Sequence, residues 1–129
     1  MIIVGLDDSK VAQEVLELAV RHAKAFGTTI VLVTSMKGGP DVPRREFVRA
    51  EKLLSKAEAF LQEADVACEG NMSVRGLEPG EDIVKFAEEK GAEQIIIGVK
   101  RRSKVGKLLF GSNAQYVILN APCPVVTIR

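Results

Sequence analysis

The chain has 129 residues, of which 47% are hydrophobic and 27% charged, and its formal net charge is +1. This length and composition are typical of one globular domain, so we expect residues 1–129 to fold as a single unit. A net charge so close to zero excludes a general attraction for nucleic acid, and every apolar run is far shorter than the roughly 18 residues of a membrane-spanning helix.

The first third of the sequence predicts a strand, a helix and a second strand. Residues 1–6 form an apolar run that ends in the Asp-Asp-Ser of residues 7–9, so we expect a buried strand that leads into a helix N-cap. Apolar residues then recur at helical spacing over residues 11–26, and Gly27 ends the helix. Residues 28–35 are rich in β-branched and apolar side chains, as in a parallel strand covered on both faces.

The middle of the sequence continues the alternation of strands and helices. Residues 37–43 hold two glycines and two prolines, which indicates a loop. One apolar face recurs between Phe47 and Leu61 and predicts a second helix. Residues 67–75 predict a third strand, although the Cys-Glu-Gly-Asn near its start is a weak strand signal.

Two further helix and strand pairs complete the pattern. The Pro-Gly-Glu-Asp of residues 79–82 begins a third helix, with acidic groups in its first turn, and Gly91 ends it. Residues 94–98 predict the fourth strand. Residues 112–119 predict a short helix before a last strand at residues 124–128.

This alternation predicts an α/β protein of Rossmann-like class, with an open, mostly parallel five-stranded sheet and helices on both faces. Ligands of such sheets bind beyond the carboxyl ends of the strands, near the point where the strand order reverses. We therefore expect the candidate site in the loops that follow the first, second and fourth strands.

The loop after the fourth strand carries the clearest binding signal. Five basic residues lie within residues 100–107, between Gly98 and a second glycine, Gly111, which precedes the helix start at Ser112. Free backbone N–H groups, a chain without obstructing side chains and a helix N-terminus together favour a phosphate. The loop is not a Walker A motif, because Leu108 occupies the position of the magnesium-binding Ser or Thr.

These residues resemble the universal stress protein family, in particular its ATP-binding members. Their motif is glycine, two residues, glycine, nine residues, and glycine followed by Ser or Thr, and the corresponding positions here are Gly98, Arg101, Gly111 and Ser112. Residues 3–9 are similar to the family's first strand and turn, and residues 121–126 are similar to its closing strand. The resemblance thus covers nearly the whole chain.

The resemblance implies an adenine nucleotide alpha hydrolase-like fold and a regulatory module of the stress response that binds ATP or AMP, with ATP possible together with magnesium. Asp7 matches the family's adenosine-site aspartate, and Ser35 lies where the end of the second strand meets the adenine. The phosphate positions of the motif are matched by Gly98, Gly111 and Ser112.

Arg101 departs from the motif, because it replaces the second glycine. Its side chain can prevent the closest backbone approach to a phosphate, or its planar fork can contact the phosphate instead. Two binding functions therefore remain open: a nucleotide-binding module, and a dimeric interaction module of the same fold that works without nucleotide.

A third alternative is a weak ATPase, but the sequence offers no convincing base, nucleophile or metal cluster beyond Asp7 and Asp8. The plainer interpretation of residues 7–9 is a helix cap, and that of the basic loop is a solvated surface. His22 fits a half-buried helix position. We expect no catalytic residue and no metal site, and binding rather than turnover.

Further expectations concern partners and location. The apolar strand at the end of the chain would leave an unpaired edge, and the resemblance implies a homodimer through this strand. We also expect an unidentified protein partner, no nucleic acid and no membrane. Cys68 and Cys123 match no metal-binding or redox spacing, and the N-terminus lacks a secretory signal, so we expect free thiols and a cytoplasmic location.

Overall fold

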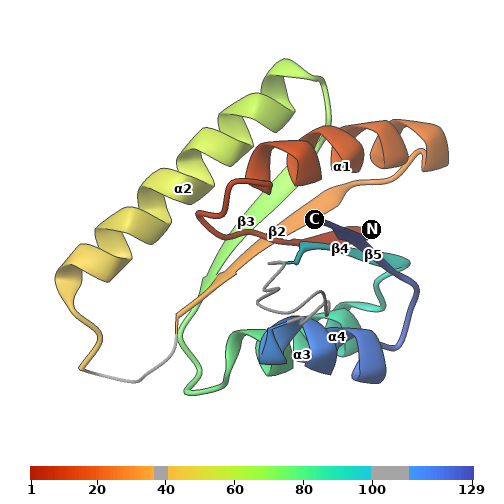
Figure 1. Cartoon of the computed structure of the whole chain (residues 1–129). Helices are drawn as coiled ribbons and strands as arrows, with labels where there is room; N and C mark the ends of the chain where they lie inside the picture. The colour runs from red at the N-terminus through yellow and green to blue at the C-terminus, as the bar shows by residue number, and fades with distance from the viewer. Residues whose placement is uncertain (37–40, 100–110) are drawn as a thin grey trace.

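The computed structural model describes residues 1–36, 41–99 and 111–129, in which strands and helices alternate (Figure 1). The elements are β1 (Ile2–Gly5), α1 (Ala12–Phe26), β2 (Ile30–Ser35), α2 (Arg44–Glu63), β3 (Cys68–Ser73), α3 (Pro79–Lys90), β4 (Gln94–Gly98), α4 (Ser112–Asn120) and β5 (Val125–Ile128). The strands form one five-stranded sheet in the order β3-β2-β1-β4-β5, and every neighbouring pair is parallel. The predicted fold class is confirmed.

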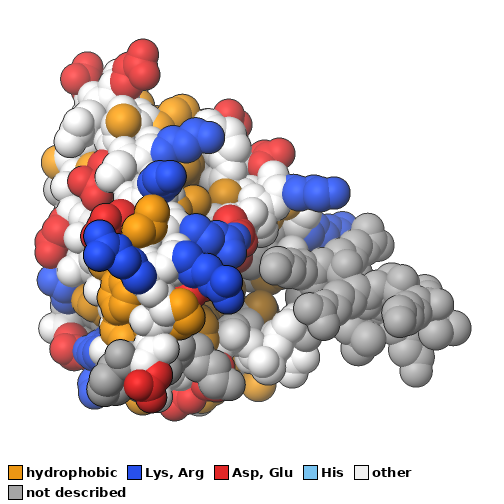
Figure 2. Space-filling view, turned by 90° about the vertical axis from the view of Figure 1, so that its left-hand side faces the viewer, with side chains coloured by type: hydrophobic (Ala, Val, Ile, Leu, Met, Phe, Trp, Pro, Cys, Tyr) orange, Lys and Arg blue, Asp and Glu red, His pale blue; other side chains and the backbone are white. Residues whose placement is uncertain are grey.

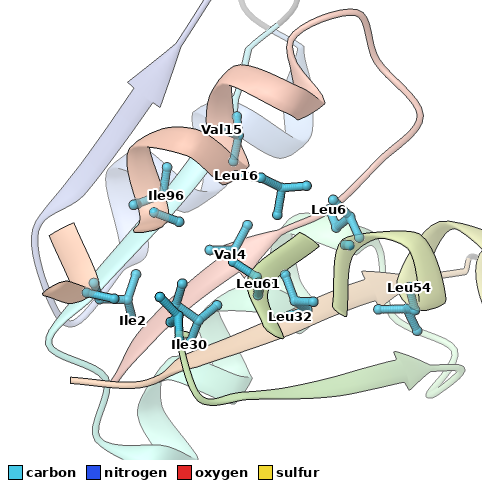
Figure 3. Close-up of a cluster of buried hydrophobic side chains, with 14 residues drawn as sticks. Ile2, Val4, Leu6, Val15, Leu16, Ile30, Leu32, Leu54, Leu61 and Ile96 are labelled. Atoms are coloured by element: carbon cyan, nitrogen blue, oxygen red, sulfur yellow. The ribbon is translucent and has the colours of Figure 1, made fainter. Parts of the chain in front are cut away.

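The sheet is covered on both faces, by α1 and α2 on one side and by α3 and α4 on the other (Figure 1). Successive side chains of a strand point to opposite faces, so Ile2 and Val4 pack toward α1 and α2, whereas Ile3 packs toward α3 and α4. Figure 3 shows the first of these two core layers. Burial on both faces accounts for the continuous apolar runs of the inner strands.

Glycines end two of the helices as predicted. Gly27 and Gly91 adopt left-handed backbone conformations, with φ angles of 62° and 64°. Their N–H groups donate to the carbonyl oxygens of Ala23 and Ala87 and so satisfy helix-terminal acceptors. A side chain at either position would strain the backbone, which explains why the sequence marks these helix ends clearly.

The prediction that residues 7–9 cap α1 is wrong. The N-cap of this helix is Val11, and no side chain caps it. Instead, Oδ1 of Asp7 accepts a hydrogen bond of 2.9 Å from the backbone N–H of Ser9, so the carboxylate closes the turn before the helix. Asp and Ser favour helix caps and tight turns for the same reason, and their sequence pattern does not separate the two.

The strand order places a switch point at the centre of the sheet. β1 and β4 are neighbours, and both strands run from right to left in Figure 1, so their carboxyl ends point to the left. From there the chain continues from β1 to a helix on one face and from β4 to a helix on the other. Ligand sites of open parallel sheets lie at such points.

None of the helices in the described ranges is long and apolar enough to cross a lipid bilayer.

Candidate functional site

A cavity of about 220 Å³ lies at the switch point, between the carboxyl ends of β1, β2 and β4 and the first turns of α3 and α4. Apolar side chains, among them Ile83 and Ile97, form much of its wall. Three of the residues predicted from the sequence also line it, namely Asp7, Ser35 and Gly98. The cavity thus combines an apolar wall with polar groups at its rim, which is typical of a small-molecule site.

Gly98 is the last residue of β4, and the N-terminus of α1 lies very close to it. An ideal Cβ at this position would lie 2.7 Å from Cγ2 of Val11 and 3.7 Å from Oγ of Ser9. Ser9 Oγ is buried and has no hydrogen-bond partner among the described residues. A buried polar atom without a partner is costly, so this hydroxyl, which lies beside the end of β4 but does not line the cavity, is a candidate contact for a polar ligand group.

The N-terminus of α4 lies beside the cavity and carries no side-chain cap. Its N-cap is Gly111, with φ −63° and ψ 156°, and its first turn contains no acidic residue. An ideal Cβ at Gly111 would meet no described atom within 4 Å. Gly111 and Ser112 are exposed and do not line the cavity, whereas Asn113 and Ala114 of the same turn do. The free N–H groups of this turn can bind an anion.

The first turns of α3 and α4 are held together by a contact that the sequence did not reveal. The backbone N–H of Gly80 donates to Oδ1 of Asn113 over 2.9 Å. A Cβ at Gly80 would lie 2.7 Å from the carbonyl oxygen of Asn113, so only glycine allows this approach. This contact fixes the α4 N-terminus relative to the cavity wall.

A buried carboxylate on α3 is a second feature missed at the sequence level. Asp82 is 1% exposed, and its Oδ2 accepts a 2.7 Å hydrogen bond from Oγ of Ser35. Its Oδ1 accepts a 2.7 Å hydrogen bond from Nε of Arg75, and Nη2 of the same guanidinium lies 2.6 Å away. The cavity residue Ser35 is therefore tied to a buried ion pair.

Arg75 is held on three sides. Besides Asp82, its Nη1 donates to Glu89 over 2.8 Å, and its guanidinium stacks over the ring of Phe86 at 4.4 Å from the centroid. Partial burial lowers the pKa of Arg75, but the hydrogen bonds to Glu89 and Asp82 outweigh it and raise the pKa above its ordinary value. The guanidinium therefore remains charged, and it compensates the buried carboxylate.

A wider groove of about 460 Å³ adjoins the cavity on the α2 side of the sheet. Arg49, Lys52 and Lys56 line it at a spacing that places them on one face of α2. Arg49 pairs with Asp8 at the groove, whereas no carboxylate of the described chain lies within ion-pairing distance of Lys52 or Lys56. Figure 2 shows basic side chains next to apolar surface on this side of the molecule.

Other features predicted from the sequence lie away from the cavity or outside the described residues. Arg101 and the basic loop fall within residues 100–110, outside the described residues. His22 is half-buried, as expected, and its Nδ1 donates to Oε1 of Gln94 over 2.7 Å. Cys68 and Cys123 are free thiols whose pKa values are raised by burial. Within the described ranges, no group of three or more His, Cys, Asp or Glu side chains could hold a metal ion.

Comparison with known proteins identifies close relatives of this chain. Residues 1–129 match the universal stress protein family. A universal stress protein of Mycolicibacterium smegmatis is 31% identical over 129 residues, which cover 100% of this chain and 97% of that protein. The sequence similarity therefore extends over both proteins from end to end.

Solved structures agree with this result. A universal stress protein from Archaeoglobus fulgidus is 39% identical with a TM-score of 0.91, over 99% of this chain and 97% of that chain. A universal stress protein from the same organism, solved in complex with dAMP, is 35% identical with a TM-score of 0.86, over 99% of this chain and 96% of that chain. On sequence and on structure, this chain belongs to the universal stress protein family.

Proposed function

We propose that this protein binds an adenine nucleotide, AMP or ATP, at the carboxyl ends of β1, β2 and β4, and that it acts as a regulatory module rather than as an enzyme. The observation that carries the proposal is the position of the cavity directly beside the uncapped N-terminus of α4. One ligand that spans both places needs a flat apolar part and an anionic part, as a nucleotide has.

The cavity suits the base and the ribose. Its apolar wall offers dispersion contacts to a flat ring, and its rim carries the carboxylate of Asp7 and the hydroxyl of Ser35. The carboxylate of Asp7 is exposed and accepts one backbone hydrogen bond, so it has free lone pairs for a ribose hydroxyl. These two groups give the site polar contacts at defined positions.

The phosphate end suits the N-terminus of α4. The dipole and free N–H groups of this turn favour an anion, and Gly111 leaves the approach open. The hydroxyl of Ser9, which has no partner among the described residues, lies near Gly98 at the end of β4 and is a further candidate donor to this anion. In this proposal, magnesium binds together with ATP, coordinated by its phosphates.

The relative of known structure from Archaeoglobus fulgidus that was solved with dAMP supports an adenine nucleotide as the ligand. It is 35% identical to this chain and has the same fold over nearly its full length. The competing function, an interaction module that works without nucleotide, rests on Arg101 in the place of a motif glycine. The experiment below separates the two.

Calorimetric titration with AMP, ADP and ATP, with magnesium and after removal of any co-purified nucleotide, tests the proposal. We expect micromolar binding to the wild type and a loss of at least about tenfold in Gly111→Val, because its side chain fills the anion's approach. The variant should keep the wild-type melting temperature, since a Cβ there meets no described atom and φ is −63°. Binding only by Arg101→Gly would instead support the interaction module.

We further propose that β5 forms a homodimer interface. This strand is at the edge of the sheet, next to α4, where Leu119 is 80% exposed. The carbonyls of Pro124 and Ile128 accept hydrogen bonds from β4, so the alternate residues Val125 and Thr127 turn their backbone groups outward. Outward N–H and C=O groups on an edge strand can pair with a second copy.

The substitution Thr127→Pro tests this interface. It removes an outward N–H group while leaving the hydrogen bonds between β4 and β5 in place. We expect a dimer for the wild type and a folded monomer for the variant in sedimentation at micromolar concentration. A wild-type monomer under these conditions would contradict the interface.

A further inference from the structure

The hydroxyl proton of Ser35 is used in a hydrogen bond to a buried carboxylate. Ser35 Oγ donates to Oδ2 of Asp82 over 2.7 Å, and Asp82 itself is 1% exposed. Ser35 lines the cavity at the switch point, whereas Asp82 does not. The serine therefore stands between a buried carboxylate on one side and the proposed ligand on the other.

The charge state of Asp82 decides the direction of this hydrogen bond. Arg75 can only donate, and it contacts Oδ1 of Asp82 through both Nε and Nη2. As a carboxylate, Asp82 has no proton to donate, so both of its oxygens accept hydrogen bonds. Because a serine hydroxyl has one proton and that proton points to Asp82, the lone pairs of Ser35 remain for a molecule in the cavity.

The backbone around Ser35 is also engaged. The carbonyl of Val33 accepts from the N–H of Leu6 over 2.9 Å, and the N–H of Met36 donates to the carbonyl of Ser73 over 2.9 Å. The N–H of Met36 is therefore not free to donate to a ligand, whereas the carbonyl of Val33 keeps one lone pair. At this end of the cavity, the side-chain oxygen of Ser35 is thus a polar contact that can accept a hydrogen bond.

We propose that the Asp82–Arg75 pair makes Ser35 an obligate hydrogen-bond acceptor, so that the cavity selects a purine with a 6-amino group over one with a 6-oxo group. The 6-amino group of adenine donates, whereas the 6-oxo group of hypoxanthine or guanine would face Ser35 acceptor to acceptor. This inference rests on the proposed nucleotide function and adds its selectivity. Sites that hydrogen-bond one ligand group discriminate strongly against an analogue that leaves the partner unpaired.

A purely structural role for the same contacts makes a different prediction. If Asp82 only anchored α3 to the end of β2, its loss would weaken all nucleotides alike and leave their affinity ratio unchanged. The ratio of the dissociation constants for AMP and inosine monophosphate is therefore the informative quantity. These two ligands differ at the 6-position and in the proton on N1.

Calorimetric titration of the full chain with AMP and inosine monophosphate tests the proposal. We expect the wild type to bind AMP at least about tenfold more tightly. Ser35→Ala should bring the ratio close to one. Asp82→Asn should lower it further or invert it, because the amide can donate to Ser35 and release the hydroxyl proton toward the cavity. Glu89→Gln, which changes Arg75's other partner, is the control and should keep the wild-type ratio.

The outcomes separate this inference from the function on which it rests. AMP binding without discrimination in the wild type, or a ratio unchanged in Ser35→Ala, would overturn the inference and leave nucleotide binding intact. Failure of both ligands to bind at millimolar concentration would overturn the nucleotide function and this inference together. If Asp82→Asn does not fold, as judged by circular dichroism, Ser35→Ala alone still decides the question.

Discussion

Among the arginines that form ion pairs in the described residues, Arg75 should be the one whose replacement by alanine destabilises the protein most. The substitution leaves the carboxylate of Asp82 buried without its cationic partner, and Ser35 remains its one side-chain donor among the described residues. It also removes the stacking of the guanidinium on Phe86 and its contact with Glu89. Each of these losses follows from one truncated side chain.

The expected magnitude follows from the exposure of the two partners. The side chain of Asp82 is 2% exposed and that of Arg75 is 30% exposed. Breaking a buried pair costs about 3–5 kcal/mol, and the partial exposure of Arg75 lets water replace some of the lost contacts. We therefore expect a loss of about 2–4 kcal/mol in the free energy of unfolding, or roughly 10 °C in melting temperature.

A matched control exists in the same chain. Arg49 forms an ion pair with Asp8 in which both side chains are 64% exposed. Exposed pairs contribute little because water screens them, so Arg49→Ala should lose less than about 1 kcal/mol. Urea unfolding of both variants, followed by circular dichroism, compares the two positions directly.

A double-mutant cycle completes the test. Arg75→Ala combined with Asp82→Ala should be less destabilised than the sum of the single changes, with a coupling of about 1–3 kcal/mol. Equal losses for Arg75→Ala and Arg49→Ala, or additive effects in the cycle, would contradict a stabilising buried pair. The buried pair would then contribute no more than a surface contact.

Two further predictions concern packing and thiol chemistry. Gly80→Ala should lower the free energy of unfolding by about 1–3 kcal/mol in urea, because its Cβ would lie 2.7 Å from the carbonyl oxygen of Asn113; an unchanged midpoint would contradict this contact. Burial raises the pKa of Cys68 and of Cys123 above the ordinary value of a thiol, and Glu58 raises that of Cys68 further. Both thiols should therefore react with a disulfide reagent at pH 7.5 much more slowly in the native protein than in urea, and rapid native labelling would argue against this burial.

Much of the fold was predictable because its signals are local. Continuous apolar runs indicated the inner strands, and Gly27 and Gly91 indicated helix ends, since only glycine adopts their left-handed backbone without strain. The family resemblance assigned Asp7 and Ser35 to one site, and the two residues line one cavity because parallel strands end at the same edge of the sheet. Local patterns were ambiguous where one residue type serves two structures, as in the turn before α1.

The parts that sequence reasoning missed depend on contacts between distant segments. Asp82 looked like an ordinary acidic residue in a first helical turn, and only the packing of α3 on β1 and β2 shows that it is buried against Ser35 and Arg75. Gly80 and Asn113 are 33 positions apart and meet because two helix starts cross. A carboxylate beside the buried Ile83 and Val84 was the one signal that could have indicated the ion pair.

Amide chemical shifts that map nucleotide binding test the proposed site most directly. Titration of ¹⁵N-labelled protein with AMP should shift the amides of Asp7, Ser35, Gly98 and Ser112, and should leave those near the end of α2, such as Glu63, unchanged. This result would place the ligand at the carboxyl ends of the strands, beside the α4 N-terminus. Shifts centred elsewhere, or no shifts at millimolar AMP, would contradict the proposed nucleotide site.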